Sequence, residues 1–75
     1  MNIAEIEDAV NRGVPFRLNV ADGDEFWVPH RDYIALPPKT APRRTFVIVY
    51  TDEGRASVLP LLTISSLTYQ SDASE

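Results

Sequence analysis

The segment Phe16–His30 limits the possible folds of this chain most strongly, because it has the pattern of two strands joined by a tight turn. Apolar and polar residues alternate on both sides of the turn, in the run FRLNVADGDEFWVPH. The dipeptide Asp22-Gly23 supplies the positive φ angles that a short hairpin turn needs. The segment therefore predicts a β-hairpin, with Phe26 and Val28 on the inward face of its second strand.

A short helix is predicted before this hairpin, over residues 3–12. Asn2 is a suitable N-cap, and Gly13 is a natural C-terminal cap. One face of the helix is apolar and consists of Ile3, Ile6 and Val10. Because a helix of about ten residues is marginal alone, we expect this face to dock on the sheet. The opposite face is acidic, which argues against a helix that lies on a membrane.

Short strands are predicted for most of the remaining chain. The turn residues Asp52, Glu53 and Gly54 predict a second hairpin, and the proline-rich loop 37–44 (PPKTAPRR) is unsuited to a sheet. The strand-like segments are Tyr33–Leu36, Thr45–Tyr50, Arg55–Leu59 and Thr63–Tyr69, the last with a bend.

The length and composition indicate one small domain over residues 1–75. The chain has no cysteine, so it can form neither a disulfide nor a thiolate metal site. It has no signal-peptide pattern at its N-terminus and no apolar run of about 20 residues, which favours a cytoplasmic protein without a membrane span.

These elements predict a mainly β fold with an N-terminal helix. Closure into a barrel removes the exposed edges of so small a sheet, so we expect a five-stranded antiparallel barrel over residues 15–69 and a polar tail over residues 70–75. The expected core residues are Phe16, Leu18, Val20, Phe26, Val28, Ile34, Phe46, Ile48, Val58, Ile64 and Leu67.

The hairpin also carries a longer pattern, F-R-h-x-h-x-D-G-x-x-h-x-V-x-H, where h is hydrophobic. It is formed by Phe16, Arg17, Leu18, Val20, Asp22, Gly23, Phe26, Val28 and His30. With the helix and later strands, it resembles a group of small uncharacterised bacterial proteins with an Sm-like (SH3-like) β-barrel, over about residues 3–69. Sm-like proteins form rings that bind RNA, so the resemblance implies the barrel, self-assembly and RNA as a possible ligand.

Catalytic and metal-binding patterns are missing from the sequence. His30 is the only histidine, and its HRD tripeptide lacks the other elements of a kinase, so we expect a structural or solvent-facing residue, with a pH-responsive contact as the alternative. Asp22, Asp24 and Glu25 lack calcium-loop spacing and are better explained as turn residues. We therefore expect no enzyme activity, no bound metal and no cofactor.

Three apolar residues fall on the face opposite to the expected core. Trp27 alternates with Phe26 and Val28, while Val47 and Val49 alternate with the expected core residues of their strand. Either the helix or the long loop covers Trp27, or all three residues form an interface. The interface hypothesis includes Trp27, Val47 and Val49.

The predicted function is a non-catalytic interaction module that self-associates through strand edges or binds another protein. The alternative is binding of RNA or single-stranded nucleic acid by the loop residues Lys39, Arg43 and Arg44, with Tyr33 or Trp27 as a stacking platform. The net charge of -4 argues against this alternative, because phosphate binding requires basic groups.

Overall fold

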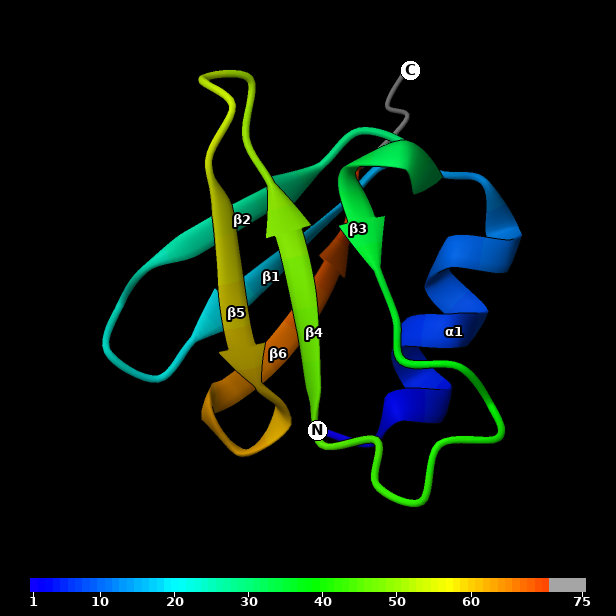
Figure 1. Ribbon diagram of the computed structural model, residues 1–75. Helices are drawn as coiled ribbons and strands as arrows, with labels where there is room; N and C mark the ends of the chain where they lie inside the picture. Colours follow the sequence, from blue (N-terminus) through cyan, green and yellow to red (C-terminus); the bar gives the residue numbers. More distant parts are fainter. Residues whose placement is uncertain (71–75) are drawn as a thin grey trace.

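The computed structural model describes residues 1–70 of the chain. This part forms one α-helix and six strands, as Figure 1 shows. Their bounds are α1 Ile3–Arg12, β1 Phe16–Val20, β2 Glu25–Val28, β3 Ile34–Ala35, β4 Phe46–Tyr50, β5 Ala56–Pro60 and β6 Ile64–Tyr69. Two turns of 3-10 helix, η1 (Arg31–Tyr33) and η2 (Leu61–Thr63), precede β3 and β6. The predicted tail, residues 70–75, lies outside the described residues except for Gln70.

Helix α1 begins and ends where the local signals predict. The side chain of Asn2 accepts a hydrogen bond of 3.0 Å from the backbone N–H of Ala4. At the other end, Gly13 adopts a left-handed φ of 71°, and its N–H donates to the carbonyl of Val10. Both caps satisfy backbone groups that a helix end leaves without partners. The prediction of a helix over residues 3–12 is confirmed.

The six strands form two antiparallel sheets of three strands each. Sheet A has the order β2-β1-β6, and sheet B has the order β3-β4-β5. In sheet A, Phe16 pairs with Val28 and Leu18 with Phe26, which confirms the first predicted hairpin. In sheet B, the register places Ile48 opposite Val58. In Figure 1 the β4–β5 hairpin crosses in front of the β1–β2 hairpin, so the two sheets are stacked at a steep angle.

The predicted five-stranded barrel is wrong. Six strands are present in the described residues, and they form two separate sheets, neither of which closes on itself. Strand β3 contains only two residues, which gives it little backbone with which to continue a sheet. Helix α1 occupies the side between β6 and β3: the guanidinium of Arg12 lies 5.1 Å from the centre of the Tyr69 ring, and Glu7 contacts Arg44 in the loop after β3. A helix therefore covers one side where a barrel would need strand pairing.

The core lies between the two sheets and α1. Of the expected core residues, five are buried: Phe16, Leu18, Val28, Ile34 and Ile64. Three others are partly buried and pack against its margin: Val20, Phe26 and Leu67. The helix contributes Ile6 and Ala9, which are both fully buried, so its docking on the sheets is also confirmed.

The expected core assignment is wrong for β4 and β5. Phe46 is 39% exposed, Ile48 is half-buried and Val58 is 59% exposed. Val47, Val49 and Leu59 take the core positions instead, with exposed fractions of 0%, 1% and 6%. Strand β4 is apolar at all five positions, so alternation alone contains no polar residue that marks its outer face.

The turn between β1 and β2 depends on Gly23, which has a φ of 101°. An added Cβ would meet no atom within 4 Å, so the cost of a side chain here comes from the backbone conformation. We expect Gly23→Ala to lower the free energy of unfolding by about 1 kcal/mol, measured by urea denaturation. Gly23→Asn should cost less, because asparagine tolerates positive φ better. An unchanged midpoint for Gly23→Ala would contradict this prediction.

Candidate interaction surface

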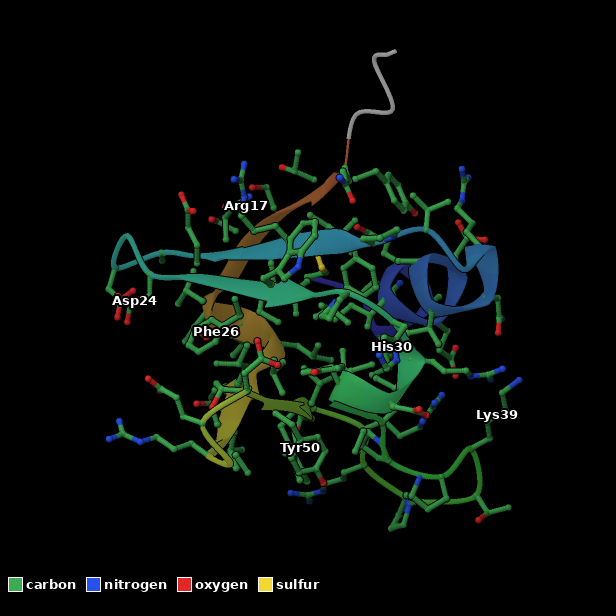
Figure 2. All side chains as sticks on the ribbon, turned by 90° about the horizontal axis from the view of Figure 1, so that it is seen from above. Arg17, Asp24, Phe26, His30, Lys39 and Tyr50 are labelled. Atoms are coloured by element: carbon green, nitrogen blue, oxygen red, sulfur yellow. The ribbon has the colours of Figure 1, made fainter. Side chains whose placement is uncertain are left out.

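The outer face of sheet B is apolar along both of its long strands. Side chains alternate across a strand, so the outward neighbours of the buried Val47, Val49 and Leu59 share the opposite face. The cross-strand pairs on this face are Phe46 with Pro60, Ile48 with Val58, and Tyr50 with Ala56. We call these six residues the β4–β5 face. In Figure 2, Tyr50 lies on the side of β4 away from β1 and β2.

The β4–β5 face exposes large side chains to solvent. Phe46 is 39% exposed, Tyr50 41% and Val58 59%. None of the six positions carries a charged or amide side chain. Contiguous apolar patches of a few hundred Å² on small proteins often mark interaction sites. The β4–β5 face is therefore the strongest candidate for a functional surface in the described residues.

The outer face of sheet A has the opposite chemistry. The Nδ2 atom of Asn19 donates to the hydroxyl oxygens of Ser66 and Thr68, at 2.9 and 3.2 Å. A guanidinium nitrogen of Arg17 lies 3.6 Å from the carboxylate of Glu25. Most polar groups named on this face thus have partners within the chain, although the Nε atom of Arg17 is buried without a hydrogen-bond partner. The contrast shows that an apolar outer face is a property of sheet B and not of both sheets.

Trp27 is an exception on the polar sheet. It lies on the outer face opposite Arg17 and is 48% exposed. Its predicted outward orientation is confirmed, since Phe26 and Val28 lie on the inner side. Neither α1 nor the long loop covers it, as the exposed fraction shows. Its participation in an interface stays a prediction.

The other two predicted interface residues belong to the core. Val47 and Val49 are 0% and 1% exposed, because β4 turns these side chains toward sheet A and α1. An interface through these two side chains is therefore excluded for the folded chain. The residues that sequence reasoning missed are their neighbours Phe46, Ile48 and Tyr50, which the same strand presents to solvent.

The predicted nucleic-acid residues do not form one surface. Arg44 makes an ion pair with Glu7 and donates hydrogen bonds to the carbonyl of Pro37. The hydrogen bond from Arg44 lowers the pKa of Glu7, and the charge of Lys39 contributes less. Lys39 and Arg43 are exposed in the same loop. One of the three cations is therefore engaged within the chain.

Tyr33 lies apart from that loop's cations. Its hydroxyl donates a hydrogen bond of 2.6 Å to the carboxylate of Asp52. This bond raises the pKa of Tyr33, because the carboxylate holds the phenolic proton. Tyr33 lines a cavity with Trp27, whereas Lys39 and Arg44 line a different one beside α1. Tyr33 and Trp27 therefore share a surface with each other and not with the basic loop.

His30 and the acidic turn have local structural contacts. The Nδ1 atom of His30 accepts a hydrogen bond from the backbone N–H of Asp32 and caps η1, while the ring stands edge-on to Tyr33 at 4.8 Å. His30 is exposed, as predicted. The carboxylate of Asp22 accepts from the N–H of Asp24 at 2.9 Å, which confirms its assignment to the turn. Within residues 1–70, no three acidic or histidine side chains are arranged to hold a metal ion.

Comparison of the chain with protein-family models, with curated proteins and with solved structures found no match. The resemblance to Sm-like proteins therefore stays a prediction. Within residues 1–70, no helix is long and apolar enough to cross a lipid bilayer.

Proposed function

We propose that the chain is a non-catalytic interaction module that self-associates through the β4–β5 face. The observation that carries the proposal is the exposure of Phe46, Tyr50 and Val58 on a face without charged residues. Burial of such a face against a second copy would remove apolar area from water at about 25 cal/mol per Å². The absence of catalytic patterns in the sequence agrees with a module that acts by binding.

A second copy is supported as the partner by the charges at the two ends of the face. Arg43 lies just before the Phe46 end, whereas the turn at the Tyr50 end contains Asp52, Glu53 and Arg55 and has a net negative charge. In a two-fold arrangement with antiparallel β5 strands, the basic end of one copy approaches the acidic end of the other. The ends that approach each other then have opposite net charges on both sides of the axis.

The size of the β4–β5 face supports a weak dimer. The six side chains expose on the order of 400 Å² per copy, against about 800 Å² per partner in a standard interface. Association also costs translational and rotational freedom, so we expect micromolar or weaker affinity. A reversible association that depends on protein concentration is the expected behaviour.

The face contributes more to this association than the free edge of β5. Backbone hydrogen bonds join Thr45 to Leu61 and Thr51 to Arg55 at the two ends of the β4–β5 ladder. Hydrogen-bonded and non-hydrogen-bonded pairs alternate between these ends. The backbone N–H and C=O groups of β5 that point away from β4 are therefore those of Ala56, Val58 and Pro60. Pro60 has no N–H to donate. A ladder between two β5 edges would therefore have the N–H groups of Ala56 and Val58 but lack a donor at Pro60, which is a common way to weaken pairing at an edge strand.

We expect Val58→Glu to weaken self-association at least tenfold while the chain stays folded. A carboxylate at the centre of the face would have to lose water on association, whereas in a single copy it remains in solvent. Sedimentation velocity over a range of concentrations measures the change, and circular dichroism checks the fold. Val14→Glu is the matched control, because Val14 is 41% exposed outside this face. A wild-type chain that stays monomeric at millimolar concentration would contradict the proposal.

A further inference from the structure

A groove lies between the two sheets on the side that α1 leaves open. Strand β2 is an edge of sheet A and β5 is an edge of sheet B. Two cavities, of about 260 and 320 Å³, lie along this side, and Phe26 lines both of them. Figure 2 shows Phe26 on the inner side of β2, directed into the space between the sheets. We call the two cavities together the β2 groove.

The backbone of β2 has free groups along this groove. The N–H of Val20 donates to the carbonyl of Asp24, so these two residues form a hydrogen-bonded pair. Along the antiparallel β1–β2 ladder, hydrogen-bonded and non-hydrogen-bonded pairs alternate from there. By this alternation, the backbone groups of Glu25 and Trp27 point away from β1. They lie two residues apart, which is the spacing at which an added extended strand forms its hydrogen bonds. An extended peptide can therefore pair with β2.

The side chains around the groove are aromatic. Phe26, Tyr33 and Val49 line its first cavity. Trp27 and Tyr50 border the same cavity, with their side chains on the outer faces of β2 and β4. Trp27 and Tyr50 are 48% and 41% exposed. Exposed aromatic rings attract cations over their faces as well as apolar side chains. The groove thus offers contact area for long side chains that end in a positive charge.

The charges around the groove all have one sign. Asp22, Asp24, Glu25 and Asp52 line the two cavities, and no lysine, arginine or histidine lines either of them. All four residues are exposed. Three of them already have partners in the chain at exposed positions: Asp22 accepts from the N–H of Asp24, Glu25 pairs with Arg17, and Asp52 accepts from Tyr33. This pattern repels nucleic acid and complements a basic peptide.

From these observations we infer that the β2 groove binds an extended, lysine- or arginine-containing peptide segment of a partner protein, which adds to β2 as a further strand of sheet A. The chain's own basic loop, residues 37–44, is a poorer occupant. Its three prolines lack N–H donors, and it forms a turn in which the N–H of Ala41 donates to the carbonyl of Pro38. The partner is therefore a different chain with alternating basic residues and free backbone donors.

The test titrates the full chain with the peptide acetyl-Lys-Val-Arg-Val-Lys-Val-amide. Trp27 is the only tryptophan, so its fluorescence reports on the groove, and calorimetry gives a second readout. We expect saturable binding that weakens as salt is added. The corresponding peptide with glutamate at each basic position should not bind. The peptide with proline at each valine position keeps the charge but loses donors, and it should bind at least tenfold more weakly.

Variants locate the binding. Glu25→Gln combined with Asp52→Asn should weaken binding of the basic peptide at least tenfold, because both carboxylates line the groove. Glu5→Gln combined with Asp8→Asn changes the net charge equally but lies outside the two cavities and the β4–β5 face, and it should bind like the wild-type chain. The double variant's fold is checked by circular dichroism, and Glu25→Gln alone is used if the pair perturbs it.

Several outcomes would overturn the inference. One is the absence of both heat and a fluorescence change at millimolar peptide. Equal losses in the two double variants would indicate general charge attraction, and equal binding of the proline peptide would exclude strand addition. If the peptide PPKTAPRR, which is the chain's own loop 37–44, bound more tightly than the lysine and arginine peptide, the occupant of the groove would be a second copy of the chain. Self-association through the β4–β5 face is measured separately by sedimentation, so failure of one proposal leaves the other to be judged alone.

Discussion

Replacing Val49 by glutamate is expected to unfold the protein. Val49 is 1% exposed and packs in the core between sheet B and the other elements. A carboxylate there would lose its water without gaining a partner, which costs several kcal/mol even after relaxation. A core in a chain shorter than about 80 residues rarely supplies more than about 3–5 kcal/mol of net stability. The cost thus reaches or exceeds the whole stability of the domain.

Circular dichroism and urea denaturation at room temperature measure this result. The variant is expected to lack the strand signal and a cooperative unfolding transition. Val58→Glu is the matched control, because it makes the same chemical change on the opposite face of the same sheet, where the side chain is 59% exposed. A folded Val49→Glu variant that is merely monomeric would contradict the buried position of Val49 and restore the interface role that the sequence predicts for it.

Replacing Ile6 by alanine is expected to lower the free energy of unfolding by about 2–5 kcal/mol. Ile6 is fully buried and, with Ala9, anchors α1 to the core. The helix has ten residues, so it is marginal without this contact, and the loss of packing also weakens the helix itself. The expected effect is second only to a charge in the core.

Urea denaturation of Ile6→Ala, with Ile3→Ala as the control, measures this effect. Ile3 lies on the same helix but is only partly buried, so its truncation removes fewer contacts and should cost less. Both changes raise intrinsic helix propensity, so the difference in stability between the two variants reports on the packing of Ile6. Equal midpoints for the two variants would show that α1 does not depend on Ile6 for docking.

Local signals in the sequence predict the helix and the first hairpin well. Asn2 and Gly13 cap α1 as expected, and Gly23 adopts the positive φ that its turn requires. Each of these features depends on residues within a few positions of one another. The polar residues Arg17 and Asn19 also mark the outer face of β1, so its core residues are predicted correctly. Where a strand has both polar and apolar residues, alternation is informative.

The faces of β4 cannot be predicted in this way. Its five residues are all apolar, and the partner strand β5 offers the weak contrast of Ser57 and Leu59 against Ala56 and Val58. The orientation depends on which side of sheet B meets sheet A and α1. That packing joins residues far apart in the chain, so the β4–β5 face and its exposed aromatic residues emerge only from the tertiary structure.

The sequence by itself determined where the helix and its caps lie and how the β1–β2 hairpin turns, because backbone conformation at caps and turns depends on neighbouring residues. Only the tertiary structure decided that the strands remain two sheets, that α1 covers one side between them, and that an acidic aromatic groove stays open on the other. The reason is physical: sheet closure and the choice of buried face depend on the packing of distant segments, for which a single strand's pattern contains no information.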